Sequence, residues 1–393
     1  MPARDSPHAI LAVFFLQAFA GGGIFPRIPD LQAALGLNEA ELGLVLMGMP
    51  LGGLSSLLFA NRITERFGTR AVCLMAIVGL AITTLCAGLA PAPLLLFIAL
   101  AANGAAFSLS NVAMNVEADR VEFTTGRPVM NRCHGLWSIG MTLATLLGAA
   151  ARGASLTPAL HFALSAMIVL LGLVFLAPRL APARARPIVS RKPGFVVLPN
   201  RLTACLVGFG LVGGVVQGSV HNWGAIFMRD SFAVADWIDA LPLPVFLVFL
   251  TAGRLMGDRM TARYRAAAVA RALALVTFVG VMMTVAAPHP AVALAGFGLL
   301  GLGIAVVFPM MVSAAAQAPD RPAAESVAAI TLLSGLVMLA VPPAIGMLAE
   351  LHGIRTAFLL MVPAILISAA MIRHIDRPGP GTPPAASGDE ISR

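Results

Sequence analysis

Charged side chains are scarce in this sequence. Asp, Glu, Lys and Arg make up 11% of the residues and hydrophobic residues make up 59%, whereas soluble domains average about 25% and about 45–50%. So few charges cannot cover the surface of a soluble protein of 393 residues. The composition therefore predicts a protein that crosses a lipid bilayer many times, and its topology has to be worked out before its function.

Cysteines are few, and the common catalytic motifs are missing. Cys73, Cys86, Cys133 and Cys205 have no paired spacing and are interpreted as isolated thiols. His134 directly follows Cys133, but adjacent residues of a helix point in different directions, so no metal site is predicted. The sequence has no Gly-rich Lys loop for ATP, no HExxH motif and no GxSxG motif. We therefore expect that the protein is not an enzyme, binds no cofactor and does not use ATP.

Long apolar runs are abundant. A helix needs about 20 largely apolar residues to cross a bilayer, and twelve runs of this kind occur. In chain order they are 9–29, 40–60, 71–90, 94–116, 132–151, 159–177, 203–227, 237–257, 266–287, 291–314, 326–348 and 355–373. The fold class predicted from them is an all-α membrane protein with twelve transmembrane helices.

The twelve runs form two sets of six. The segment between the sixth and seventh is rich in Pro and Arg and too polar to span. We predict an N-terminal half over 1–177, a basic cytoplasmic linker over 178–202, a C-terminal half over 203–373 and a disordered cytoplasmic tail over 374–393. Two repeated halves predict a solute site between them, near the middle of the membrane.

The basic residues predict the orientation. If the N-terminus lies inside, alternate loops place every Lys and Arg on the inner side except Arg27, Arg152, Arg229 and Arg355. This positive-inside bias predicts that both termini are cytoplasmic. It also explains the net charge of +8 by topology, so no nucleic-acid partner is expected. The short N-terminus leads into a long span without a cleavage site, which indicates a retained first helix.

Each half has an acid–Arg pair in a short cytoplasmic turn at the same place, Glu65–Arg66 and Asp258–Arg259. These could be ordinary solvated charges, but matching placement in a chain with few charges favours a function. We predict a cytoplasmic gate that closes when the cavity faces outward, in which acids at the end of the fourth span pair with the arginines. Its members are Glu65, Arg66, Arg70, Glu117, Asp258 and Arg259.

Polar side chains interrupt the fourth and fifth spans. Asn111 and Asn115 are four residues apart, and His134, Trp137 and Ser138 are spaced i, i+3, i+4, so each set shares one helix face. Unsatisfied polar groups in hydrocarbon are costly, so these faces are predicted to line a substrate path. The alternative is hydrogen bonding between helices.

The first and seventh spans carry further polar residues. Gln17 lies on a stripe of the first span, and the seventh carries Gln217, His221, Asn222 and Trp223; all five are assigned to the path. Trp223 could instead belong to the aromatic belt of the membrane interface. Near the outer end of the first span, Arg27 and Asp30 are three residues apart and are predicted to pair, either as an interfacial anchor or at an outer gate.

His134 is the residue expected to relay protons. An unperturbed imidazole titrates near pH 6.5, within the physiological range. The alternative is a neutral histidine that donates a hydrogen bond to a backbone carbonyl.

Several segments resemble the major facilitator superfamily over essentially the whole chain. Residues 65–70, ERFGTR, resemble the superfamily loop signature Asp-Arg-x-Gly-Arg-Arg, and the second copy keeps Gly257, Asp258 and Arg259. Three segments, 114–140, 218–230 and 342–358, resemble the branch of the superfamily that contains rhizopine-type permease and, more distantly, fucose permease. The resemblance implies two six-helix halves and alternating access.

This sequence departs from the fucose type at its acidic positions. Phe25 and Asn111 stand where buried acids of the first and fourth spans occur, and the amides Gln217 and Asn222 stand near acids of the seventh. An amide can hydrogen-bond to a hydroxyl-rich solute but cannot carry a proton at physiological pH.

The sequence predicts a secondary transporter for a small, polar, sugar-like solute, with a proton or other ion gradient as the driving force. It is expected to be a monomer in the bacterial inner (plasma) membrane. The alternatives are an antiporter for efflux of a drug or metabolite and, in a different class, a membrane-embedded sensor or enzyme without transport. The solute, the direction and the stoichiometry are left open.

Overall fold

The computed structural model describes residues 7–180, 200–316 and 323–375, and in these ranges every regular element is helical. Twelve helical stretches are long and apolar enough to cross a membrane, which confirms the predicted class and the number of spans. The predicted linker lies mostly, and the predicted tail almost wholly, outside the described residues.

The first six spans use the elements α1 to η2. Their bounds are α1 (Pro7–Gly22), η1 (Phe25–Arg27), α2 (Ile28–Leu35), α3 (Glu39–Leu46), α4 (Gly48–Phe67), α5 (Thr69–Gly88), α6 (Pro93–Thr125), α7 (Met130–Gly153), α8 (Pro158–Leu176) and η2 (Ala177–Arg179). The last six use α9 (Arg201–Ser231), α10 (Asp236–Asp239), α11 (Pro242–Arg263), α12 (Ala266–Val285), α13 (Pro290–Ile304), α14 (Val307–Ala316), α15 (Ala323–His352), α16 (Ile354–Phe358), α17 (Met361–Met371) and η3 (Ile372–His374).

Local sequence signals explain where these helices begin and end. Asn38 and Glu41 form a reciprocal capping box at the start of α3. Gly68 between α4 and α5 has φ of 81°, and Gly126 at the end of α6 has φ of 65°, a backbone region that favours glycine. Proline occupies the first turn of α6, α8, α11 and α13, where its missing N–H costs nothing.

The same helix pairing occurs in both halves. In the first half α6 packs against α4 and α5, and in the second half α13 packs against α11 and α12. Glycine permits the closest approach in each: a Cβ on Gly104 would collide with the Met49 carbonyl, and a Cβ on Gly301 would collide with the Phe246 carbonyl. The predicted repeat is therefore visible as equivalent helix contacts.

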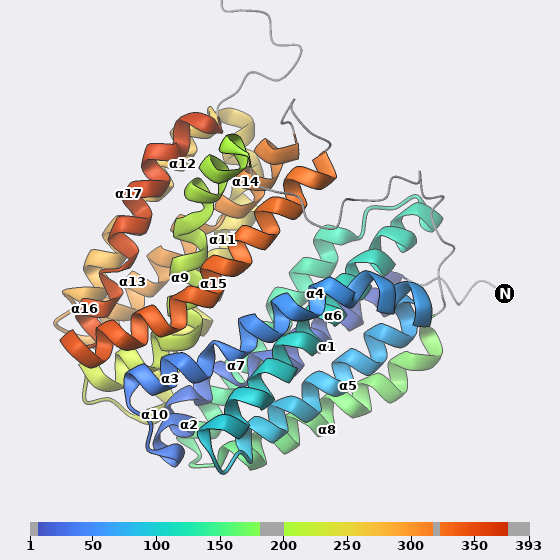
Figure 1. Ribbon diagram of the computed structural model, residues 1–393, viewed down its shortest axis with the longest axis horizontal. Helices are drawn as coiled ribbons and strands as arrows, with labels where there is room; N and C mark the ends of the chain where they lie inside the picture. The colour runs from blue at the N-terminus through green and yellow to red at the C-terminus, as the bar shows by residue number, and fades with distance from the viewer. Residues whose placement is uncertain (1–6, 181–199, 317–322, 376–393) are drawn as a thin grey trace, which may run out of the picture.

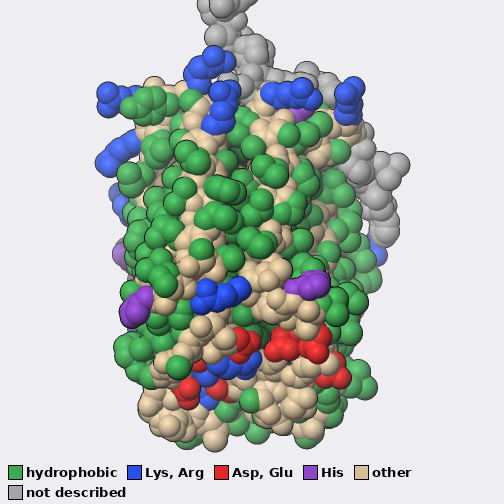
Figure 2. Space-filling view, turned by 90° about the vertical axis from the view of Figure 1, so that its left-hand side faces the viewer, with side chains coloured by type: hydrophobic (Ala, Val, Ile, Leu, Met, Phe, Trp, Pro, Cys, Tyr) green, Lys and Arg blue, Asp and Glu red, His purple; other side chains and the backbone are tan. Residues whose placement is uncertain are grey.

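The two halves lie side by side and diverge from the end where α3, α10 and α15 meet (Figure 1). The opposite end carries exposed arginines, among them Arg62, Arg66, Arg127, Arg259 and Arg263, and is named the basic end. Figure 2 shows Lys and Arg around this upper rim, an apolar band below it, and acidic and basic side chains together near the lower end, named the far end.

Candidate functional site

The two halves are sealed together at the far end by close backbone packing. There α3 of the first half packs against α15 of the second. A Cβ on Gly43 would lie 2.7 Å from the Pro342 carbonyl oxygen, and one on Gly346 would collide with the Glu39 carbonyl. The Glu39 N–H also donates to Glu350 Oε2 at 3.2 Å. Because only glycine fits at Gly43 and Gly346, this contact is specific to the arrangement in which the far end is closed.

A cluster of charged side chains lies beside this seal. Arg27 Nε is 2.8 Å from Asp30 Oδ2, and Arg152 Nε is 3.2 Å from Asp30 Oδ1. Arg152 also forms an ion pair with Asp239 of the second half. Arg27, Arg152 and Asp239 are buried, with side chains 2%, 5% and 2% exposed. Two arginines and two aspartates thus neutralise one another across the boundary between the halves.

The predicted pairing of Arg27 with Asp30 is present, but its setting was not predicted. Arg27 is buried inside the protein and also donates a hydrogen bond to the Leu156 carbonyl. Arg152 and Asp239, which join the two halves, were not identified from the sequence.

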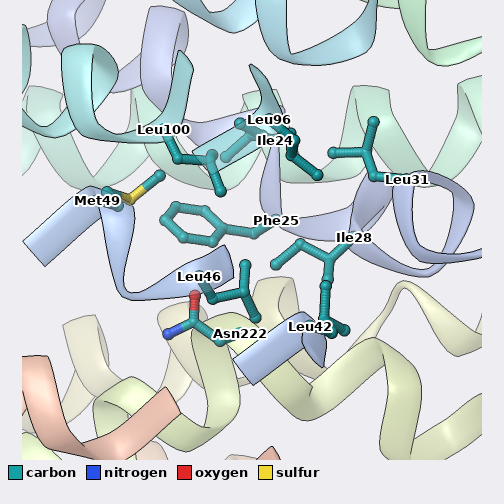
Figure 3. A pocket seen from close by; sticks show the side chains of 10 residues that line it. All are labelled: Ile24, Phe25, Ile28, Leu31, Leu42, Leu46, Met49, Leu96, Leu100 and Asn222. Carbon is teal, nitrogen blue, oxygen red and sulfur yellow. The ribbon is translucent and has the colours of Figure 1, made fainter. Parts of the chain in front are cut away.

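An apolar plug lies inward of the ion cluster. Figure 3 shows the Phe25 ring surrounded by apolar side chains from Ile24 and from α2, α3, α4 and α6, with Asn222 of α9 as the polar neighbour. The space among these residues is about 10 Å³, about the smallest that holds one water molecule. The Phe25 ring also meets the edge of His221 at 5.0 Å. Two predicted path residues, His221 and Asn222, therefore lie at the seal between the halves.

A larger cavity lies between this plug and the basic end. Its volume is about 340 Å³, and its walls come from α9, α11, α13, α14 and α15 of the second half. Gln217, Arg254 and Ser334 supply its polar side chains, and the rest of the lining is glycine or apolar. Gln217 sits near the middle of α9. Arg254 is exposed, so the cavity is accessible to solvent. Its volume is near the small end of the range for ligand sites.

The polar residues of the first half form a separate network. Trp137 Nε1 donates to Gln17 Oε1 at 2.8 Å, and Gln17 Nε2 donates to Ser110 Oγ at 3.3 Å. Gln17 is fully buried. Because Gln17 lies on α1, Ser110 on α6 and Trp137 on α7, the network joins these three helices. Ser138 donates to the His134 carbonyl one turn earlier. Ser110 was missed because a serine in a helix often bonds only to a carbonyl of its own helix, as Ser110 also does to Phe107, so its sequence position does not indicate a distant partner.

His134 and the two asparagines are more accessible. His134 is exposed, and its ring meets Phe14 edge-on at 5.3 Å. Asn115 Nδ2 donates to the Asn111 carbonyl and to Asn111 Oδ1, both at 2.8 Å. The predicted shared face of the two asparagines is therefore present, and both remain half-buried.

Trp223 lies away from the cavity. It is fully buried, and its ring lies against Gly346 of α15. The sequence pattern could not distinguish this packing role from stacking on a solute, since both need a large flat side chain.

The described residues of the predicted loop gate have the following contacts in this structure. Arg66 lies over the Phe67 ring at 5.5 Å, and Arg70 donates to the Ala177 carbonyl at 2.7 Å. Glu117 is buried and accepts a hydrogen bond from Thr69, with Arg120 at 3.7 Å. Glu65 and Arg259 are exposed at the basic end. The side chain of Asp258 lies outside the described part of the chain.

Comparisons with known proteins place this arrangement in a family. The family model described as Major Facilitator Superfamily matches residues 10–338. An uncharacterized MFS-type transporter of Yersinia pestis is 30% identical over 93% of this chain and 94% of its own length. Membrane protein MosC of Rhizobium meliloti is 25% identical over 95% of this chain and 91% of its own.

Solved structures share the fold. A mutant of the nucleoside transporter NupG has a TM-score of 0.78 at 14% identity and covers 94% of this chain and 100% of its own. A mutant of the fucose:proton symporter FucP of E. coli has a TM-score of 0.62 at 15% identity, and the match covers 95% of this chain and 98% of the symporter chain. At these identities the likeness concerns the fold alone.

Proposed function

Because this multi-pass chain belongs to the Major Facilitator Superfamily, we propose that it is a secondary active transporter that moves a small polar solute by alternating access. One observation carries the proposal. The two halves are joined at the far end by packing and by a buried ion cluster, whereas the 340 Å³ cavity lies on the other side of the plug. A site closed toward one side and accessible from the other is one of the two states that alternating access requires.

The side to which the cavity opens follows from the charge distribution. The exposed arginines at the basic end favour the cytoplasm for that end by the positive-inside rule. On this proposal both termini are cytoplasmic in the inner membrane of a bacterium, and the structure is the inward-facing state.

A polar solute and proton coupling are supported by the lining and by the relatives' fold. The amide of Gln217 and the hydroxyl of Ser334 on the cavity wall can both donate to and accept from a hydroxylated solute. A symporter of fucose and protons shares the fold. His134, exposed on α7, is the residue we propose for proton relay, because an imidazole titrates in the physiological range.

The cavity wall also favours a second function. Val207, Leu211, Phe308, Met311 and Met338 make much of it apolar, and flexible Met side chains adapt to varied ligands. Export of an amphiphilic drug or metabolite in exchange for protons is therefore the alternative.

The loop arginines are proposed to form a gate in the opposite state. Arg66 has no ion-pair partner among the described residues in this state. Closing the basic end would bring the loops of the two halves together, where Arg66 and Arg70 could pair with acids. We expect Arg66→Ala to reduce occupancy of the outward-facing state, as measured by accessibility labelling; unchanged labelling and transport would contradict this gate.

The test of the transport function has two steps. A thermal-shift screen of purified protein against sugars, inositols, amino acids and amphiphilic drugs identifies compounds that bind. Flux of these compounds in vesicles with an imposed pH gradient then distinguishes the alternatives: accumulation with the proton gradient supports uptake, and gradient-driven extrusion supports efflux. Binding without vectorial flux would contradict both and favour a sensor.

A further inference from the structure

Arg254 places a positive charge on the wall of the cavity, near the basic end. It lies on α11 three residues before Gly257, where the apolar span ends, so it is about one helical turn inside the span. Its side chain lines the central cavity. Among the described residues it forms no ion pair or hydrogen bond, and no acidic residue lies in the cavity wall.

Arginines near the far end of the spans are compensated by the protein itself. Arg27 and Arg152 are balanced by Asp30 and Asp239. Arg355 donates to the carbonyls of Val285 and Ala287 at 3.0 and 2.9 Å. A charged side chain within a span normally faces a partner or a water-filled cavity, and it marks a functional site. Arg254 faces the cavity, and the side chain of Asp258, one turn further along α11, lies outside the described part of the chain.

From this we propose that the solute is a small hydroxylated organic anion whose carboxylate or phosphate binds Arg254. This inference rests on the transport function proposed above. A guanidinium is the side chain best suited to the task, because its planar fork matches both groups with two parallel hydrogen bonds. Gln217 and Ser334 on the same wall supply the hydrogen bonds for the hydroxyl groups.

The experiment compares acidic compounds with their neutral counterparts. Purified full-length protein is titrated with gluconate and sorbitol, with glucuronate and glucose, and with glucose 6-phosphate, and binding is followed by thermal shift. The variants are Arg254→Gln, Arg254→Lys and the control Arg263→Gln, which removes the same charge from the exposed end of the same helix. We expect an acidic compound to bind the wild type at least tenfold more tightly than its neutral counterpart. Arg254→Gln should abolish this preference, Arg254→Lys should retain part of it, and Arg263→Gln should leave it unchanged.

Three results would overturn the inference: no acidic compound binds the wild type, the neutral counterpart binds equally well, or Arg254→Gln retains the acid preference. A carboxylate-only or phosphate-only response identifies which anionic group is recognised. Counterflow in vesicles separates this inference from the transport function. Exchange of a neutral compound by both wild type and Arg254→Gln would leave transport standing and refute the anion. Arg254-dependent binding of an acidic compound without any counterflow would support recognition of the anion and refute the transport function.

Discussion

Replacing Arg152 by glutamine should open the far end of the protein. Asp239 is 2% exposed, and Arg152 is its ion-pair partner in the structure, so the variant leaves a carboxylate buried without a counter-charge. Removing one partner of a buried pair costs about 3–5 kcal/mol. The ion pair joins the two halves only while the far end is closed, so the cost falls on that state. At about 1.4 kcal/mol per factor of ten, the equilibrium should shift about 100- to 4000-fold toward the state that is open there.

Distances between spin labels measure this shift. Ala34 of α2 and Ala235 before α10 are exposed and belong to different halves, so cysteines at these positions, in a background without the native ones, report the opening. Arg229→Gln is the matched control: Arg229 and Asp230 form a partly exposed pair at 2.6 Å within a single helix, and surface pairs contribute about 0–1 kcal/mol. We expect longer distances for Arg152→Gln and no change for Arg229→Gln.

A double variant tests the cause. Arg152→Gln with Asp239→Asn removes the unpaired charge, and replacing both members of a buried pair costs much less than removing one. Distances should therefore return toward those of the wild type. Equal distances in wild type and Arg152→Gln, or equal opening in the Arg229→Gln control, would refute the ion cluster as the element that holds the far end closed.

Three further predictions concern other parts of the molecule. Gly346→Ala should open the same end, because the added Cβ collides with the Glu39 carbonyl, whereas Gly135→Ala, which meets nothing within 4 Å, should not; the same spin labels report both. Gln17→Leu leaves the Trp137 N–H and the Ser110 hydroxyl without their partner and should lower stability by about 1–3 kcal/mol in thermal unfolding; a loss of transport at unchanged stability would instead favour the path interpretation. His134→Gln should abolish accumulation driven by a pH gradient but spare counterflow, because glutamine keeps an N–H donor and cannot carry a proton; unchanged accumulation would mean that His134 is structural.

The spans could be predicted because their signal is local. Each depends on about 20 consecutive apolar residues, and most predicted boundaries fall within a few residues of the helix ends. The larger differences are extensions: the first span continues to Leu35, the second to Phe67 and the fourth to Thr125. These helix ends extend beyond the hydrocarbon core of the bilayer and carry polar side chains. In such segments the composition of the side chains does not distinguish a helix from a loop.

The contacts between the halves could not be predicted, because they join residues far apart in the chain. Arg152 and Asp239 are 87 positions apart, and nothing near either residue identifies its partner. Arg254 was counted with the inner arginines of its loop, because the helix that carries it into the cavity wall has a polar end. Trp223 was assigned to the substrate path or to the aromatic belt, but the helix turns Trp223 into the protein interior.

The four arginines that do not follow the positive-inside bias each have a structural contact. Arg27, Arg152, Arg229 and Arg355 are the arginines that the predicted topology places outside. Arg27 and Arg152 form the ion cluster, and Arg229 pairs with its neighbour. Arg355 caps carbonyls and lies over the Phe232 ring at 4.9 Å. The positive-inside rule explains arginines in cytoplasmic loops but not arginines on the outer side. An arginine on the outer side therefore needs a structural or functional cause. Arg254, which lines the cavity and has no ion pair or hydrogen bond among the described residues, is the cation from which the charge of the solute is inferred.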